Sequence, residues 1–475
     1  MERARMEYPD QTENASYIRS ELRTAVQAKP SHPWKPTAMW ITLCVFLSLV
    51  LLSGKPAEAT TRHLSGIVKE DYDDTMTVGA YYYPWYGKSF HSGGGYLRQN
   101  LSQGPMLGEY DDTRPDVVQQ HLEWSQYAHI GLWITSWWGP NRLEDDTTKN
   151  VILKVVEGTS HKIALLYETL GRLKDENGTQ STHRITDDIS YMADTYFEHP
   201  NYFRINSRPV LVLYVTRTLD NEPGLLEETL LLARTAAAKK GYNIYLIGDQ
   251  AFGDPPVVGG TLTPEAKAFN YLDAVTNYDV YGSMGRNYAD EADVDDFYDK
   301  QKIWRNLSKK DDCAFIPSVT PGYNDLGVRM KANHTPLSRK LSPTSPEGSL
   351  FEASLKRAVR QVDPAVGNLL FVNSFNEWHE DTQIEPCVGP TTVEPYNFTR
   401  GLEYEGYGLL YLNILKKMTP RAMISSNSQD VQSSKGRDKR PPEYANTQPS
   451  ITDSKRKQRG RKYHNVFSDD EEDED

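Results

Sequence analysis

Two carboxylates stand three residues apart in the segment Asn376-Glu377-Trp378-His379-Glu380. An apolar neighbour such as Trp378 and a titratable one such as His379 can give two nearby acids different pKa values. One acid can then donate a proton while the other accepts one. Glu377 and Glu380 are therefore the candidate catalytic pair, acting as a general acid and a base.

The chain before this pair has the pattern of a buried strand. Residues 369–375 (LLFVNSF) form a short run that is mostly apolar and rich in bulky side chains. A strand alone would send Glu377 and Glu380 to opposite faces, because three is an odd offset in a period of two. If the chain turns at Glu377, both acids can converge at the C-terminal end of the strand. We therefore expect a turn or coil directly after this strand.

Seven similar runs precede this strand, and polar-apolar stretches of helical length separate them. The predicted strands are Val78–Tyr83, Leu132–Trp137, Ile163–Tyr167, Val210–Val215, Ile244–Ile247, Ala274–Tyr278, Cys313–Val319 and Leu369–Phe375. The predicted helices include Asp116–His129, Asp187–Glu198, Leu225–Lys240, Glu291–Leu307 and Glu405–Met418. This alternation predicts an α/β fold, a single (β/α)8 TIM-type barrel with long loops. A doubly wound open sheet is the main rival, but no Gly-rich phosphate loop follows an early strand.

In a barrel of this type the active site lies at the C-terminal ends of the strands. Those ends are rich in aromatic and charged residues here, which suits a polyol substrate. The faces of a sugar ring stack on aromatic side chains, while carboxylates and an arginine hold its hydroxyls. The predicted substrate-binding residues are Tyr82, Tyr83, Trp85, Trp137, Glu168, Tyr278, Tyr323, Arg329, Asn376, Trp378 and His379.

Some of these residues have a structural alternative. Tyr81 and Trp85 could equally belong to the core, and His379 suits an orienting or packing role. Glu168 favours a functional role, because an unpaired buried carboxylate is costly. No set of residues has metal-ligand spacing, and no Ser or Cys stands in a nucleophile-elbow context. The sequence therefore predicts no metal site and gives little support to acyl transfer.

Composition narrows the class of function. The chain has 475 residues and a net charge of −12, which argues against a nucleic-acid partner for the main domain. Three cysteines make no disulfide framework; Cys313 and Cys387 could pair, although their spacing does not require it. Five sequons are compatible with the secretory pathway; they begin at Asn100, Asn177, Asn306, Asn333 and Asn397.

The two ends of the chain differ in character from its body. Residues 38–54 carry no charge and approach the length of a transmembrane helix. Four basic residues between positions 19 and 35 favour a cytosolic N-terminus. Cleavage after the A-x-A motif at residues 57–59 is the alternative. The predicted organisation is a cytoplasmic tail over 1–37, a signal anchor over 38–54, a linker over 55–76, the barrel over 77–420 and a disordered charged tail over 421–475.

The order of the motifs along the barrel resembles that of glycoside hydrolase family 99, over residues 77–419. The matching segments are 82–87 (YYPWYG), 136–137 (SW), 316–319 (IPSV), 321–323 (PGY) with Arg329, 374–380 (SFNEWHE) and 382–385 (TQIE). Asp381 departs from the family, since the animal members carry glycine there. Residues 166–170 (LYETL) keep Glu168 but lack the flanking His and Pro of the family. These departures concern substrate contacts more than the chemistry.

The resemblance implies retaining hydrolysis without a protein nucleophile. Glu380 would protonate the departing glycosidic oxygen, and Glu377 would deprotonate the sugar's own 2-hydroxyl to form a 1,2-anhydro intermediate. Such substrate-assisted enzymes are exceptions to the usual retaining pair. We expect the pKa of Glu380 to be the raised one and that of Glu377 the lower, helped by Arg329. Tyr278 would lie near the reacting sugar and Trp137 would be a stacking platform, with no metal or organic cofactor.

The same resemblance implies an endo-acting α-1,2-mannosidase that cleaves within glucosylated high-mannose N-glycans. It would be a single-pass type II protein of the Golgi membrane with a luminal barrel, or a secreted protein if the signal is cleaved. We expect a monomer whose partners are the glycan and, through residues 38–54, the membrane. Two alternatives stay open: a related barrel hydrolase acting on another mannan or polysaccharide, and a non-catalytic glycan-binding barrel.

Overall fold

The structure is a computed structural model. The residues that it describes are 76–90, 103–174, 181–182, 184–221, 224–255, 257–258, 261–262, 268–284, 286–329, 334–388 and 399–419. The predicted cytoplasmic tail, signal anchor and C-terminal tail lie outside them, as does the predicted linker except Met76. Of the five sequons, only the one at Asn306 begins at a described residue, and Asn306 is exposed. Across the described ranges, no helix is long and apolar enough to cross a membrane.

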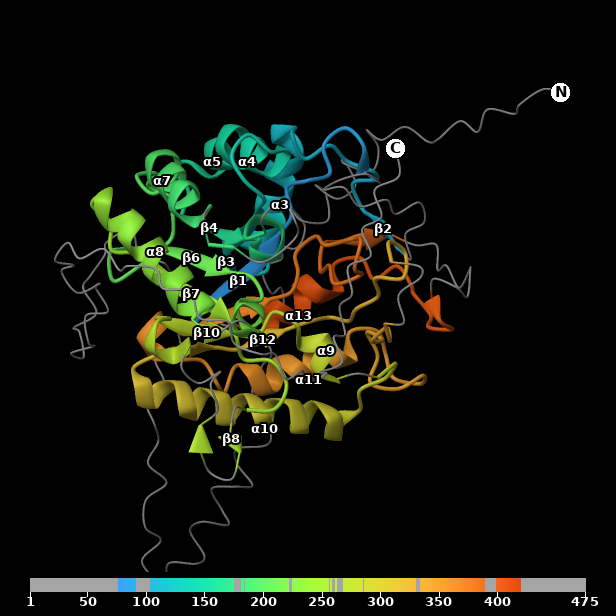
Figure 1. The fold of residues 1–475 in the computed structure, drawn as a ribbon. Coiled ribbons are helices and arrows are strands. Elements are labelled where there is room, and N and C mark those ends of the chain that lie inside the picture. The colour runs from blue at the N-terminus through green and yellow to red at the C-terminus, as the bar shows by residue number, and fades with distance from the viewer. Residues whose placement is uncertain are drawn as a thin grey trace, which may run out of the picture. The chain divides into compact units, whose positions relative to one another are not determined.

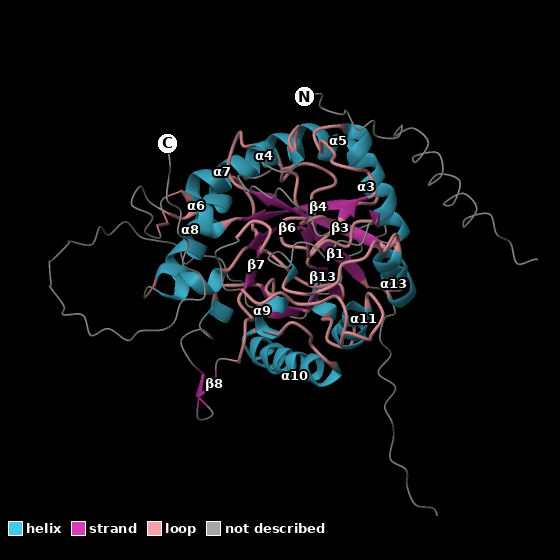
Figure 2. Cartoon of the chain, turned by 90° about the vertical axis from the view of Figure 1, so that its right-hand side faces the viewer, coloured by secondary structure: helices cyan, strands magenta, loops and turns pink. Residues whose placement is uncertain are grey.

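In the described part of the chain, a ring of eight parallel strands forms the centre of the fold and helices surround it (Figures 1 and 2). The strands are β1 (Thr77–Tyr82), β3 (Ile130–Trp137), β4 (Lys162–Tyr167), β6 (Arg208–Leu213), β7 (Tyr245–Asp249), β10 (Ala274–Thr276), β11 (Ala314–Ile316) with β12 (Ser318–Val319), and β13 (Leu369–Val372). Their order is β11-β10-β7-β6-β4-β3-β1-β13-β12. Only Pro317, which has no N–H for a ladder, separates β11 from β12. The two are therefore parts of one strand, the ring closes, and the predicted barrel is confirmed.

The helices alternate with the strands as predicted, and more of them are present than the sequence analysis named. They are α3 (Pro115–Tyr127), α4 (Leu143–Thr147), α5 (Leu153–Val156), α6 (Thr169–Arg172), α7 (Ile185–Thr195), α8 (Leu225–Lys239), α9 (Val280–Met284), α10 (Glu291–Ser308), α11 (Ser349–Ala358) and α13 (Leu410–Met418). Short strands pair outside the barrel: β2 (Gly104–Pro105) with β14 (Cys387–Val388), and β8 (Val257–Val258) with β9 (Thr261–Leu262). A further short strand, β5 (Arg204–Ile205), pairs with β6.

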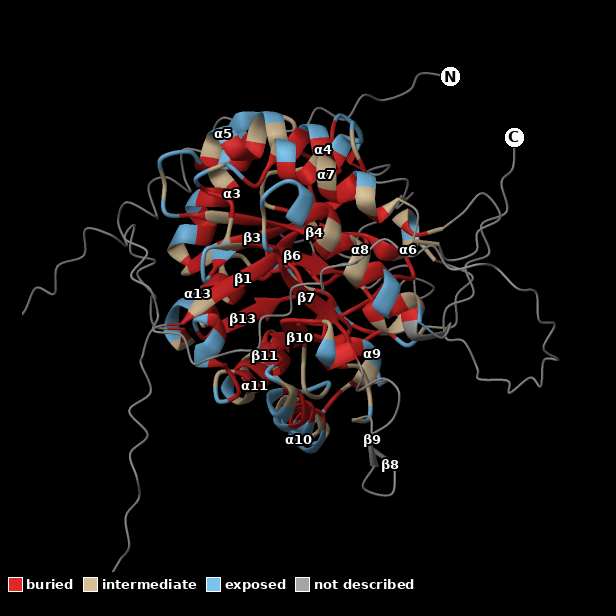
Figure 3. Cartoon of the chain, turned by 60° about the vertical axis from the view of Figure 1, so that its left-hand side comes forward, coloured by how far each residue is buried: buried red, intermediate tan, exposed pale blue. Residues whose placement is uncertain are grey.

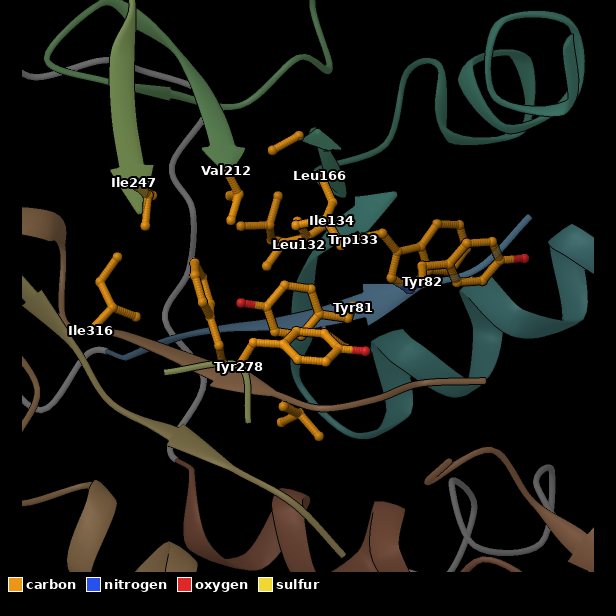
Figure 4. Packing of buried hydrophobic residues seen from close by; sticks show 14 of the residues in the cluster. Tyr81, Tyr82, Leu132, Trp133, Ile134, Leu166, Val212, Ile247, Tyr278 and Ile316 are labelled. Carbon is orange, nitrogen blue, oxygen red and sulfur yellow. The ribbon is translucent and has the colours of Figure 1, made fainter. Parts of the chain in front are cut away.

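The core occupies both faces of the barrel wall, and the barrel strands are buried along most of their length (Figure 3). Side chains alternate along each strand, so Tyr81 points to the barrel interior while Tyr82 points outward. Inside, Tyr81 packs edge to face against Tyr278 with ring centroids 4.8 Å apart. Outside, Tyr82 stacks on Trp133 at 4.5 Å. Figure 4 shows the two groups on opposite sides of β1.

Several predicted elements are longer than the observed ones. The strand predicted to end at Tyr278 ends at Thr276, because the N–H of Tyr278 donates to the side chain of Asp249 rather than to a neighbouring strand. The last strand ends at Val372 and the last helix begins at Leu410. Polar side chains therefore replace the sheet ladder where the strands reach the barrel mouth.

The two described cysteines do not pair. Cys313 and Cys387 are both buried free thiols. Burial raises the pKa of Cys387 to about 12, which keeps this thiol protonated and unreactive. The possible disulfide between them is therefore excluded.

Candidate active site

The chain turns directly after β13, and this turn carries both candidate acids. Past Val372, the N–H of Glu377 donates to Ser374 Oγ at 2.9 Å. The turn closes where Thr382 N–H donates to the carbonyl of Glu377 at 3.3 Å and Ser374 N–H donates to the carbonyl of Thr382 at 2.8 Å. The turn expected from the odd spacing of the acids is thus present. We call residues 374–385 the acid loop.

Glu377 is the more deeply buried acid, with 3% of its side chain exposed. The backbone N–H of His379 donates to Glu377 Oε1 at 2.8 Å, and His379 Nδ1 lies 3.4 Å from the same oxygen. The His379 ring packs beside Trp85 and Tyr86, with centroids 5.9 and 5.4 Å away. A backbone N–H directed at a carboxylate favours its charged form. Glu377 therefore has the contacts that a base requires, and His379 has an orienting position.

Glu380 is the more accessible acid, with 16% of its side chain exposed. Its Oε1 lies 2.9 Å from Arg329 Nη1, which also lies 3.1 Å from Asp325 Oδ2. Burial raises the pKa of Glu380, the guanidinium of Arg329 partly offsets this rise, and the charge of Glu377 adds to it. That mutual charge effect means that the two acids share one site. A raised pKa is what a proton donor needs.

Two tyrosines adjoin the acids from the ends of β1 and β10. The hydroxyls of Tyr83 and Tyr278 are hydrogen-bonded to each other. Burial raises the pKa of Tyr83 well above its ordinary value, and the charges of Glu168 and Glu377 raise it further. The pKa of Tyr278 is raised by burial and by its neighbours Tyr83 and Glu380. Both phenols therefore stay neutral and can donate hydrogen bonds beside the acids.

A third carboxylate, Glu168, faces the same site from the end of β4. Ser136 Oγ donates to Glu168 Oε1 at 2.6 Å. Burial raises the pKa of Glu168 from 4.5 to about 8; the bond from Ser136 opposes the rise, and the charges of Glu144, Glu377 and Glu380 support it. Glu168 is therefore a neutral acid at pH 7, and it can donate as well as accept a hydrogen bond.

The exposed ring on this side is Trp138, not the predicted Trp137. Trp138 is half-buried, its Nε1 donates to Ser136 Oγ at 3.1 Å, and a Cβ on Gly171 would come within 2.2 Å of its ring. Trp137 points outward, where its Nε1 donates to Asp145 Oδ1 at 2.9 Å. The inward position of Ser136 explains this, since neighbouring residues of a strand face opposite sides. The stacking platform predicted at Trp137 is not at the mouth.

Tyr82 and Trp378 also point away from the acids. Tyr82 hydroxyl lies 2.8 Å from His121 Nδ1, and Trp378 Nε1 donates to Glu385 Oε2 at 2.7 Å. His121 and Glu385 are themselves 3.2 Å apart in a fully buried pair between α3 and the acid loop. Both aromatic residues therefore support the outer face of the barrel, and neither is in a position to contact a substrate at the mouth.

Asn376 and Trp85 connect the first strand with the acid loop. Asn376 binds both backbone groups of Tyr83: its Oδ1 accepts from the N–H at 2.8 Å and its Nδ2 donates to the carbonyl at 3.0 Å. Trp85 packs against the Tyr83 ring at 4.6 Å. Asn376 is fully buried, so its role is to hold these two segments together.

The last predicted aromatic residue, Tyr323, belongs to a stacked pair. Its ring lies 3.7 Å from that of Tyr281 at an interplanar angle of 3°. Burial raises the pKa of both tyrosines, and the charge of Glu380 is the next contribution in each case. This dependence indicates that the pair stands close to the candidate proton donor.

The structure brings most of the predicted residues together. Those at or beside the mouth are Tyr83, Trp85, Glu168, Tyr278, Tyr323, Arg329, Glu377, His379 and Glu380. The sequence analysis missed Ser136, Glu144, Trp138, Tyr281 and Asp325. Strand alternation separates Ser136 and Trp138 from Trp137, although it does not say which face is inside, and the offset of four residues from Arg329 could have suggested Asp325. Across the described residues, no three His, Cys, Asp or Glu side chains are grouped so as to hold a metal ion.

Comparison with known proteins identifies the family of the chain. The family model of glycosyl hydrolase family 99 matches residues 78–232 and 272–419. Glycoprotein endo-alpha-1,2-mannosidase of Mus musculus is 25% identical over 408 residues, which are 77% of this chain and 78% of that protein. The protein of the same name from Rattus norvegicus is 25% identical over 391 residues, 72% of this chain and 74% of its own length.

Solved structures agree on the fold. The GH99 endo-alpha-mannosidase of Bacteroides thetaiotaomicron superimposes with a TM-score of 0.52 at 21% identity, covering 73% of this chain and 97% of the bacterial one. At this level of identity the likeness concerns the barrel fold. The residues that match the family model include the end of β1 and the acid loop.

Replacing Glu168 by glutamine should remove a pH dependence of stability. The folded pKa of about 8 lies above the unfolded value, so the contribution of the Glu168 carboxyl to stability is full below about pH 4 and is lost as the pH rises through 8. Glu168→Gln cannot ionise and should exceed the wild type above pH 8 by roughly a few kcal/mol, at about 1.4 kcal/mol per pKa unit. Urea unfolding at pH 5 and pH 9 measures this difference.

The matched control is Glu157→Gln, an exposed glutamate after α5 that should unfold like the wild type at both pH values. Equal stability of wild type and Glu168→Gln at pH 9 would mean that the Glu168 carboxyl is not held neutral.

Proposed function

Because the chain belongs to glycosyl hydrolase family 99 and is a glycoside hydrolase, we propose that it is an endo-acting α-1,2-mannosidase that cleaves within glucosylated high-mannose N-glycans. Its relatives from mouse and rat are named glycoprotein endo-alpha-1,2-mannosidase, which supports the reaction and the class of linkage. The observation that carries the proposal is the acid loop. It holds two carboxylates at one buried site, with Glu380 beside Arg329 and Glu377 accepting the backbone N–H of His379.

In the first proposed step the substrate supplies its own nucleophile. Glu377 takes the proton of the mannose 2-hydroxyl, and the O2 oxygen forms a bond to C1. The bond between C1 and the glycosidic oxygen breaks, and Glu380 gives its proton to that oxygen. The raised pKa of Glu380 supports this assignment, because a protonated carboxyl must be available at the working pH. The products are a 1,2-anhydro sugar and the free leaving group.

In the second step water opens the anhydro ring with the two acids in reversed roles. Glu380, now a carboxylate, takes a proton from water as its oxygen bonds to C1. The bond between C1 and O2 breaks, and Glu377 returns its proton to O2. C1 is inverted twice, so the product keeps its configuration, and both acids end in their starting states.

The other residues of the mouth would bind the sugar. Neutral Glu168 and the phenols of Tyr83 and Tyr278 can donate hydrogen bonds to hydroxyls without adding charge. Trp138 is the half-buried ring on the Glu168 side, where a sugar face can stack. Since residues 166–170 depart from the family, a related hydrolase acting on another mannan or polysaccharide is the second candidate. Digestion of a glycan panel separates the two by the oligosaccharide that is released.

We expect Glu380→Gln and Glu377→Gln to differ in their response to the leaving group. On a glucosylated high-mannose glycan, each should lower kcat/KM by about 10² to 10⁴. An α-mannosyl fluoride of the matching disaccharide needs no proton at its leaving group. Glu380→Gln should therefore recover much of its first-step rate on the fluoride, whereas Glu377→Gln should remain slow on both substrates.

The measurement is a pre-steady-state rate of fluoride release, beside product analysis of the glycan digest. Equal losses of the two variants on the fluoride would contradict the assignment of Glu380 as the acid. A wild-type protein that leaves every glucosylated mannose substrate intact would refute the proposed substrate.

Arg329→Met should shift the pH profile of kcat/KM to higher pH. The guanidinium lowers the pKa of Glu380, so its removal lets that pKa rise. A general acid works while protonated, and the alkaline limb of kcat/KM should shift to higher pH. Arg357→Met is the control, because Arg357 pairs with Asp295 and Glu291 on the outer helices. An unshifted or downward limb in Arg329→Met, with the control at wild type, would oppose Glu380 as the acid.

We also propose that the barrel faces the lumen of the Golgi and that residues 38–54 anchor it. This follows from the uncharged segment and the basic residues before it. In sealed microsomes, a C-terminal tag on the full chain should resist protease until detergent is added. Digestion of the tag without detergent would mean that the C-terminus is cytosolic, which contradicts the proposed orientation. Recovery of the chain in the culture medium would favour the cleaved signal.

A further inference from the structure

The backbone of the acid loop is held by a buried arginine, Arg339. Arg339 is 3% exposed and precedes α11 in the chain. Its Nη2 donates to the carbonyl of Asp381 at 2.9 Å and to that of Gln383 at 3.0 Å. These carbonyls stand on either side of Thr382, the residue that closes the turn of the acids. One guanidinium nitrogen therefore holds both flanks of that closure.

The backbone at this point needs such a partner. Asp381 has a φ of +52°, the left-handed region that glycine adopts most easily and that Asp tolerates. It directly follows Glu380, so any rotation at Asp381 changes the direction in which the acid loop leaves Glu380. A carbonyl bound in the core restrains that rotation. The distance between Glu377 and Glu380 thus depends on the residue that binds the carbonyl of Asp381.

Arg339 is itself held on its other sides. Its guanidinium carbon lies 5.1 Å from the ring centroids of both Tyr407 and Tyr411. A Cβ on Gly322 would come 2.8 Å from Arg339 Cγ and 2.9 Å from a backbone oxygen. The glycine of the Pro321-Gly322-Tyr323 motif therefore leaves room for the arginine to pass. A buried cation is costly unless hydrogen-bonded, which indicates a specific role for its contacts.

We propose that Arg339 is the positioning residue for the catalytic pair, and this rests on the proposed roles of Glu377 and Glu380. Arg339 fixes the carbonyls of Asp381 and Gln383, and through them the distance and orientation of the two acids. Tyr407 assists, because its hydroxyl donates to the carbonyls of Gln383 at 3.3 Å and Glu385 at 2.7 Å.

The first test compares two buried arginines. Arg234 of α8 is 5% exposed and also binds carbonyls, those of Ile244 and Tyr271, but near the opposite ends of the strands. Arg339→Lys should lower kcat per folded molecule by about 10²-fold with a smaller change in KM, because misplaced catalytic groups lose rate more than binding. Arg339→Lys should also shift the limbs of the pH profile of kcat/KM. Arg234→Lys should lose stability and keep kcat and the pH profile.

The second test uses milder variants that should fold. Tyr407→Phe removes the hydroxyl that reaches the acid loop, and kcat should fall roughly 3- to 10-fold, as for one lost hydrogen bond. The control is Tyr202→Phe, which removes a buried hydroxyl that donates to the carbonyl of Val210 at 2.8 Å, away from the acid loop. Tyr202→Phe should therefore keep kcat within twofold of the wild type. Equal kcat in both variants would overturn the proposal.

Hydrogen exchange gives a readout that needs no activity. In Arg339→Lys, amides 374–385 should exchange faster while β1 and β3 keep wild-type rates; in Arg234→Lys the acid loop should stay protected. Uniform acceleration across the barrel in Arg339→Lys, or an unchanged acid loop, would overturn the positioning role. A wild type inactive on all glycans would refute the proposed function, and the exchange data would still decide whether Arg339 fixes the loop.

Discussion

Several carboxylates are buried together at one end of the barrel. The rest of the site depends on this constraint. A buried charge must be paired, hydrogen-bonded or neutralised. Glu377 receives a backbone N–H, Glu380 receives Arg329, and Glu168 receives the hydroxyl of Ser136, while burial raises the pKa of Glu168 to about 8. Three acids of similar intrinsic strength are thereby held by different contacts, and burial raises the pKa of Glu168 and of Glu380. The supporting contacts of each acid, rather than its own chemistry, set its role.

The barrel makes this crowding possible because its strands end at one rim. Residues at the ends of β1, β4, β10 and β13 are distant in sequence and adjacent in space. Alternation along each strand then divides the aromatic residues between two tasks. Tyr83 reaches the acids, while Tyr82 packs against Trp133 on the outer face. The same alternation brings Ser136 to Glu168 and sends Trp137 toward Asp145.

Much of this arrangement could be predicted from local pattern. All eight barrel strands, the turn at the acids and the shared site of Glu377 and Glu380 follow from apolar runs and from an odd spacing. The direction in which a single side chain points at a strand end could not be predicted from the sequence. Aromatic residues are compatible with either face of a strand, and the register decides between the two faces. Trp137 and Trp138 show this, since both are aromatic neighbours and only one is at the mouth. Contacts such as that of Arg339 with the acid loop join segments with no sequence signal in common.

The two arginines near the acid loop act through different physics, and the difference explains why the site uses both. Arg329 touches a carboxylate, so it changes the pKa of Glu380 and remains 32% exposed, where water moderates its charge. Arg339 is directed at carbonyl dipoles and is buried, so its contacts set backbone geometry. If Arg329 alone held the loop, the proton affinity and the position of Glu380 could not be adjusted separately. With Arg339 behind the turn, substitutions at the mouth can alter the pKa while the spacing of the acids is kept. The mechanism that we propose, with two carboxylates at a fixed separation, requires this independence.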